Sequence, residues 1–216
     1  MKKNIFTVML IFLAAIGYCQ DTVTIYYDAK WKKINDWNSA VFYSKGYQNP
    51  DGLWTVTDHF KSGRVQMTGF YKSLKNQYKQ GLFTYYYESG IKESEGYFKD
   101  NLMDGEWKYW NEKGRLTSKQ LYKRNIIQQI ESYHPNGTVK QKGSIKNNQK
   151  DGKWFYYDYN GRLIFEGLYS NNLREGIWAR HLPDTTITIN YFRGNIIEDK
   201  GTLVRGRDEG RRIYDN

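Results

Sequence analysis

The chain offers few residues that could hold a metal or transfer a proton. Its three histidines, His59, His134 and His181, are far apart in the sequence, and each lies at or near a predicted hairpin turn. No pair of them has the spacing of metal ligands, and the single cysteine, Cys19, falls in the N-terminal leader. We therefore expect three solvent-exposed turn histidines and no metal site.

Other patterns that carry catalysis are missing from the sequence. No serine lies in a Gly-x-Ser-x-Gly sequence, which would place a nucleophile on a sharp turn. No glycine-rich sequence opens a predicted helix after a strand, as phosphate-binding and dinucleotide-binding loops do. We expect no bound cofactor.

Carboxylates are the remaining candidates, because a glycosidase needs only two of them at a suitable distance. Glu95 and Glu166 occupy equivalent places in two repeats, and so do Asp104, Asp151 and Glu175. Recurrence at one repeat position indicates a structural role, such as turn formation or pairing with lysine and arginine on a neighbouring strand. We expect no enzyme, and a hydrolase with a cryptic carboxylate pair is the alternative.

These side chains would be positioned by a repeat that runs from Gly81 to Trp178. The leading glycines Gly81 and Gly105 are 24 residues apart, and so are Gly152 and Gly176, while a further unit begins at Gln128. A second glycine falls nine residues into the units, at Gly90, Gly114, Gly137 and Gly161. A third falls six residues later, at Gly96, Gly143 and Gly167, with Gln120 as the exception. A fixed period of this size is typical of a repeat array.

Each unit is typical of a β-hairpin. The second glycine closes a turn dipeptide, such as Asn136-Gly137 or Asn160-Gly161, between runs of aromatic and β-branched residues. Glycine and asparagine are favoured there because hairpin turns need positive φ. Polar stretches at 99–104, 146–151 and 170–175 would be loops that join one hairpin to the next.

Alternation along a strand places the residues two and four after each leading glycine on one face. The first of these positions gives a row of large apolar residues: Trp54, Phe83, Trp107, Ile130, Trp154 and Trp178. This row predicts the core. The third glycine lies on the same face, and we expect it to leave room for a ring that reaches across from the neighbouring strand.

The order Gly-x-Trp-x-x-Tyr, Asn-Gly-x-Leu, Glu-Gly-x-Tyr and Asn-x-x-x-Gly resembles the variant MORN repeat, over roughly Asp51 to Arg180. The resemblance implies an elongated, twisted antiparallel meander of hairpins with a role in binding rather than catalysis. Bacterial chains of this type are often labelled YwqK-like antitoxins. That label fits poorly with an exported protein, and we do not adopt it.

The first 19 residues are predicted to be a signal peptide. Lys2 and Lys3 precede an apolar run from residue 5 to 16, which is too short to span a membrane. We expect cleavage between Cys19 and Gln20, and therefore a periplasmic, cell-surface or secreted protein. The alternative is lipid attachment at Cys19, for which the bulky Tyr18 is unfavourable.

The mature chain is predicted to be one all-β domain: about six 24-residue hairpin repeats in an elongated twisted antiparallel meander. Residues 20–51 would form an N-terminal cap with strands at 22–27 and 40–43, and Trp31 and Trp37 between them in a turn or short helical piece. A separate functional head is the alternative for this segment. Residues 52–199 would form the repeats, and residues 200–216 a degenerate C-terminal repeat.

The net charge of the chain limits the classes of partner but does not identify one. The chain has 33 basic and 23 acidic residues, a net charge of +10, and no dense basic block. Solvated lysines on an outer sheet face are the simplest interpretation. Attraction to an acidic surface polymer or to lipid head groups is the alternative. We expect no nucleic acid as ligand, and a monomeric protein.

The candidate binding residues are rings of opposite parity to the tryptophan row: Tyr86, Trp110, Phe155 and Tyr157. On adjacent strands they would form an aromatic stripe that the fold does not need. Alternatively, both faces pack, and loops or lysine stems cover the stripe. The sequence thus predicts an exported, non-catalytic MORN-repeat protein that acts as a protein-binding or scaffold module in the cell envelope.

Overall fold

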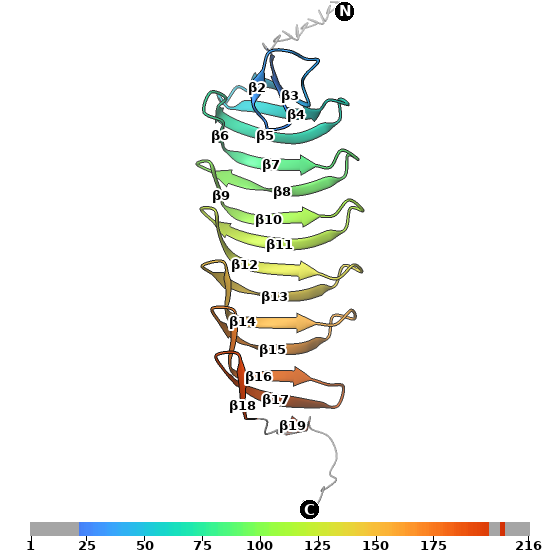
Figure 1. Ribbon diagram of the computed structural model, residues 1–216, viewed down its shortest axis with the longest axis vertical. Helices are drawn as coiled ribbons and strands as arrows, with labels where there is room; N and C mark the ends of the chain where they lie inside the picture. The colour runs from blue at the N-terminus through green and yellow to red at the C-terminus, as the bar shows by residue number, and fades with distance from the viewer. Residues whose placement is uncertain (1–21, 199–203, 206–216) are drawn as a thin grey trace, which may run out of the picture.

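A computed structural model describes residues 22–198 and 204–205 of the protein, which form one sheet of 19 strands. Figure 1 shows the hairpins stacked along the long axis of the molecule, with the chain running from one end to the other. The strands are β1 (Val23–Tyr27), β2 (Lys33–Ile34), β3 (Phe42–Gln48), β4 (Trp54–Phe60), β5 (Val65–Ser73), β6 (Tyr78–Lys79), β7 (Gly81–Tyr86), β8 (Lys92–Lys99), β9 (Leu102–Met103), β10 (Gly105–Trp110), β11 (Leu116–Lys123), β12 (Ile126–Tyr133), β13 (Val139–Lys146), β14 (Gln149–Tyr157), β15 (Leu163–Ser170), β16 (Leu173–His181), β17 (Thr185–Phe192), β18 (Asn195–Glu198) and β19 (Val204–Arg205).

The sheet is an antiparallel meander, as predicted. Six long hairpins follow one another: β4–β5, β7–β8, β10–β11, β12–β13, β14–β15 and β16–β17. The N-terminal segment adds β1 and β3, and β3 pairs with β4. Trp31 and Trp37 lie around the short strand β2, in turns and not in a helix. The predicted signal peptide and most of the predicted last repeat lie outside the described residues.

The tight turns and the longer turns are exchanged relative to the prediction. In the glycine turns only the glycine has positive φ: Gly90 has a φ of 87°, and its N–H bonds the carbonyl of Tyr87 at 2.8 Å. The stretches predicted to be loops are the tighter turns. In each, two consecutive residues have positive φ, as at Asn171 and Asn172, with φ of 49° and 67°. This is the pattern of a two-residue type I′ turn, which asparagine tolerates.

A ring-over-glycine contact builds the core. The indole of Trp178 covers Gly167 on the preceding strand, where an added Cβ would come within 2.2 Å of the ring. The other contacts of this kind are Phe83 over Gly69, Trp107 over Gly96 and Trp154 over Gly143. These four rings are at most 2% exposed, although a single sheet carries them. The predicted role of the third glycine is therefore confirmed.

Cationic side chains cover three of these four rings in place of a second layer, and Met103 packs against the cluster that contains the fourth, Trp107. Lys150 places its Nζ 4.1 Å from the ring centre of Trp154 and donates to the Tyr156 hydroxyl at 2.9 Å. Arg174, in the equivalent position, has its guanidinium carbon 4.7 Å from the ring centre of Trp178. Burial lowers the pKa of Lys150. Long stems over apolar rings thus keep the core face dry.

The first hairpin is out of step with the predicted ring row. In a later hairpin the core ring pairs with the third glycine, as Trp154 pairs with Gly167, and the leading Gly152 pairs with Tyr169. In the first hairpin it is Val56 that pairs with the glycine, Gly69, and Trp54 takes the place of the leading glycine opposite Tyr71. The two extra residues of this unit therefore lie at the start of β4. The prediction that Trp54 belongs to the ring row is wrong, and the smaller Val56 holds that place.

Candidate functional site

The four predicted binding residues lie on the face of the sheet opposite the buried rings, which we call the outer face. Tyr86, Trp110 and Tyr157 each form the last pair of their strand before the glycine turn. Phe155 lies two residues before Tyr157 and pairs with Lys142 and Glu166. All four are half-buried, so each ring presents part of its surface to solvent.

Every long hairpin has a ring at this last-pair position. We call the set the outer ring row: His59, Tyr86, Trp110, Tyr133, Tyr157 and His181. Its members lie on every second strand, so the expectation of adjacent strands is wrong, because a returning strand separates each pair. Sequence reasoning missed Tyr133, His59 and His181. Tyr133 and His181 lie five residues after their leading position, as from Gly176 to His181, and this fixed distance was their signal. His59 lies seven residues after Gly52, because its unit has two extra residues.

Lysines of the returning strands lie between these rings. The Nζ of Lys92 is 5.2 Å from the ring centre of Trp110, and that of Lys142 is 5.7 Å from the ring centre of Tyr157. These distances permit cation–π attraction, which is modest at exposed sites. The lysine stems thus cover part of the rings, as the alternative interpretation supposed, while the rings stay half-exposed.

Glutamates alternate with the lysines on the outer face. Glu95 bonds Lys92 at 2.6 Å, and Glu166 lies between Lys153 at 2.7 Å and the Nε2 of His181 at 3.3 Å. The hydrogen bond from Lys153 lowers the pKa of Glu166, with a smaller contribution from His181. The predicted pairing with a basic residue on a neighbouring strand is confirmed for Glu166, whereas Glu95 pairs with Lys92 of its own strand.

The other recurring carboxylates hold the tight turns. Each accepts a hydrogen bond from the backbone N–H of a positive-φ residue in the following turn. The pairs are Asp104 with Arg124 at 3.3 Å, Asp151 with Asn171 at 3.4 Å, and Glu175 with Arg193 at 3.0 Å. Their recurrence is thus structural, as predicted.

The histidines are less exposed than predicted. His134 is only 8% exposed, stacks on Tyr159 at 4.1 Å between ring centres, and has its Nε2 2.9 Å from the carbonyl oxygen of Tyr157. The expectation of a solvent-exposed turn residue is therefore wrong, because this turn packs against that of the next hairpin. His59 stacks on Tyr43, and burial lowers its pKa.

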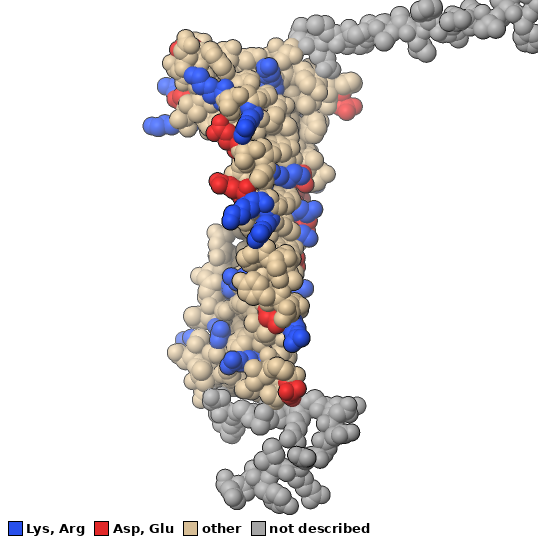
Figure 2. Space-filling view, turned by 90° about the vertical axis from the view of Figure 1, so that its right-hand side faces the viewer, with Lys and Arg blue, Asp and Glu red and all other residues tan. Residues whose placement is uncertain are grey.

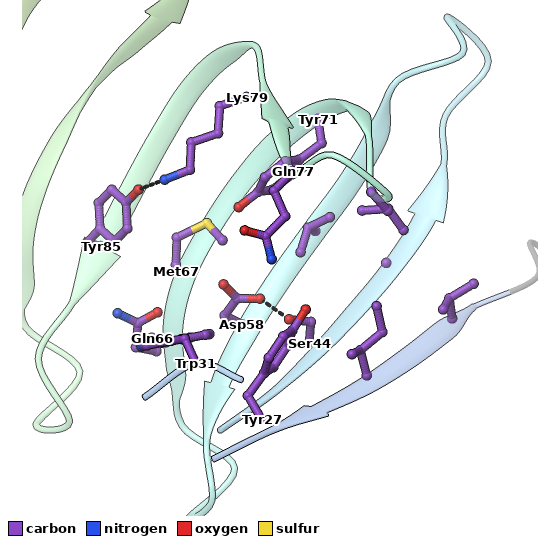
Figure 3. A pocket seen from close by; sticks show the side chains of 15 residues that line it. Tyr27, Trp31, Ser44, Asp58, Gln66, Met67, Tyr71, Gln77, Lys79 and Tyr85 are labelled. Atoms are coloured by element: carbon purple, nitrogen blue, oxygen red, sulfur yellow. Dashed lines mark hydrogen bonds between the residues drawn. The ribbon is translucent and has the colours of Figure 1, made fainter. Parts of the chain in front are cut away.

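A pocket of about 250 Å³ opens on the core face, where β1 and β3 meet the first hairpins (Figure 3). It exists because the first repeat lacks two rings. Val56 stands where most later units have a phenyl or indole ring, and Asp58 stands where three of them have a tyrosine, Tyr85, Tyr109 or Tyr156. The aromatic part of the lining comes from Tyr27, Trp31, Tyr71 and Tyr85.

Asp58 is the buried charged group of this pocket. It is 7% exposed and accepts a hydrogen bond from the Ser44 hydroxyl. Burial raises the pKa of Asp58 to about 6, against the opposing effects of that bond and of Lys79. Lys79 instead donates to the Tyr85 hydroxyl at 2.9 Å, and no ion pair to Asp58 forms within the described chain.

Sequence reasoning missed Asp58 because the units were aligned from their leading glycine. If the units are aligned on their turn glycines instead, Val56 becomes equivalent to Phe83, since each lies seven residues before its turn glycine, Gly63 or Gly90. Asp58 then falls in a row of tyrosines. A carboxylate in an aromatic row was the available signal.

Residues 22–198 contain no group of three or more histidine, cysteine, aspartate or glutamate side chains that could hold a metal ion. In the same part of the chain there is no helix of the length and apolar character needed to cross a membrane.

Comparison with known proteins identifies the repeat. A family model described as "MORN repeat variant" matches four times, over residues 79–100, 103–124, 129–147 and 150–171. No curated protein matches the chain. Among solved structures, the chain is similar to one titled "Crystal structure of GtfA/B complex bound to UDP and GlcNAc", with 10% identity and a TM-score of 0.24. The match covers 52% of this chain and 22% of that one.

Proposed function

Residues 79–171 are variant MORN repeats, and from this premise we propose that the protein is an exported, non-catalytic binding module of the cell envelope. MORN repeats are consistent with a protein-binding or membrane-binding repeat module. The more specific proposal is that the outer face binds a protein partner.

The observation that carries this proposal is the outer ring row. The core rings are used up by ring-over-glycine packing, whereas the outer rings recur in six hairpins and keep part of their surface exposed. Half-exposed rings such as Trp110 and Tyr157 suit a protein interface, where tyrosine and tryptophan dominate the binding free energy. A repeat array presents such a surface along its whole length.

The charge pattern favours a protein over an acidic polymer. Charges of both signs lie side by side on the outer face: Glu95 pairs with Lys108, and Glu131 pairs with Lys119 and with Lys142. Lys108 and Lys119 are neighbours of like charge between these pairs. Figure 2 shows basic and acidic side chains interspersed along one side of the molecule. A polyanion would be repelled by the glutamates, whereas a protein with mixed charges would not.

Export is part of the proposal and rests on the predicted signal peptide. Mass spectrometry of the protein recovered from its native envelope or secreted fraction should give an N-terminus at or close to Gln20. An intact Met1, or a lipid mass on Cys19, would contradict cleavage at that site.

A pull-down from envelope and secreted fractions, at low and at roughly 0.3 M salt, tests the partner class. A specific protein should survive the higher salt, because apolar contacts are not screened. A partner held only by charge should be lost, since screening shortens with ionic strength. Recovery of an acidic polymer, at low salt alone, would overturn the protein-binding proposal in favour of a charge-based binder.

A further inference from the structure

The pocket on the core face interrupts the packing that fills the rest of that face. At Gly69, Gly96, Gly143 and Gly167, a phenyl or indole ring from the next strand occupies the space beside the glycine. At Gly46 the neighbour is Val56, whose Cγ2 would lie 3.4 Å from an added Cβ, an ordinary contact that leaves space beyond it. The space amounts to about 250 Å³. That is below the roughly 300–1,000 Å³ of sites for drug-sized ligands.

A negative charge lies at the floor of this space. Asp58 is held by Ser44, and the one cation that lines the pocket, Lys79, bonds Tyr85 and lies 4.7 Å from the ring centre of Phe98. In Figure 3 the amine of Lys79 points to Tyr85, and Asp58 lies apart from both. A carboxylate buried without a cation is costly for a folded protein unless it has a partner.

The walls are suited to a cation with an apolar body. Tyr27, Trp31, Tyr71 and Tyr85 line the pocket, and aromatic faces attract ammonium groups as well as apolar surface. Trp31 is held by stacking on Phe42, with ring centres 4.4 Å apart and an angle of 6° between the planes. It remains 40% exposed, so the wall is pre-formed and open to solvent.

We propose that this pocket binds a small protonated amine, with the ammonium group bonded to Asp58 and the apolar part among the tyrosine rings. The size of the pocket limits the ligand to a fragment, and the carboxylate selects a donor with positive charge. The pocket is separate from the outer face, so a test of amine binding does not depend on the protein-binding proposal.

Calorimetric titration of the purified protein with benzylamine and with benzyl alcohol tests the site. The two probes have nearly the same shape and differ in charge. Benzylamine should bind at pH 7.5, and benzyl alcohol at least about tenfold more weakly, because it cannot pair with the carboxylate. Lowering the pH to 5 should weaken benzylamine about tenfold as Asp58 gains a proton. The tyrosines of the lining stay protonated over this range, since burial raises their pKa values. Burial lowers the pKa of Lys79, against the opposing attraction of Asp58.

The variant Asp58→Asn should lose benzylamine binding by at least about tenfold at pH 7.5 and lose the pH dependence. Asparagine keeps the shape of the aspartate side chain and can still accept a hydrogen bond from the Ser44 hydroxyl. A melting curve checks that the variant folds. Glu112→Gln removes an exposed carboxylate from a distant turn and should bind as the unchanged protein does. Equal binding of the two probes, or undiminished binding by Asp58→Asn, would overturn the proposal.

Discussion

Trp178 lies over Gly167, so closely that a single added Cβ would approach the indole to 2.2 Å. The same contact recurs in three other places and buries four large rings on a sheet with no second layer. The glycine and the ring are therefore one packing unit, shared by two neighbouring repeats. This unit explains why the third glycine recurs with the repeat period.

Gly167→Val should destabilise the protein by about 1–3 kcal/mol, because the branched side chain overlaps the ring of Trp178. Gln120→Val is the matched control. Gln120 occupies the equivalent place but is followed by Ile130, so no indole covers it. Thermal or denaturant unfolding should show a large loss for the first variant and a small one for the second. Equal losses would remove the explanation for the glycine.

Lys150→Ala should cost about 1–2 kcal/mol, because it uncovers Trp154 and removes the cation from three rings. Lys150→Met should recover most of that loss. Met103 occupies the equivalent position in another repeat, where it pairs with Phe98 as Lys150 pairs with Ile145. Unfolding measurements in which methionine is no better than alanine would show that cover by the stem is not what matters.

Asp58→Asn should stabilise the protein above pH 6 and make little difference near pH 4. Burial raises the pKa of Asp58 from 3.8 to about 6, so the folded protein binds this proton more tightly than the unfolded chain does. Stability from this group is therefore present at low pH and lost as pH rises through 6, by up to about 3 kcal/mol. Unfolding of both proteins from pH 4 to 7.5 tests this. A variant less stable than the unchanged protein at pH 7.5 would contradict it.

The regular part of the fold could be predicted because its signals are local and repeated. Period, turn glycines and alternation together predict the hairpins and the ring that fills the place beside Gly167. The turn types could not be separated, since Asn-Asn and Asn-Gly both tolerate positive φ, and only the pairing register shows which stretch is the tighter turn.

The irregular part was missed for a physical reason. Two extra residues at the start of β4 shift the first unit, and a forward count places Trp54 where Val56 packs. That shift hid Asp58 and with it the pocket. The outer rings were found only in part. His59 and His181 are not counted as aromatic residues, and Tyr133 belongs to the unit that begins at Gln128 instead of a glycine.

The double variant Trp110→Ala with Tyr157→Ala tests most directly the central claim that the outer face binds and the core face holds the fold. We predict a melting temperature within a few degrees of the unchanged protein and loss of the partner in the pull-down. Tyr159→Ala, which removes an exposed ring from a turn instead, should keep the partner. A collapse of the melting temperature, or retention of the partner by the double variant, would contradict the account.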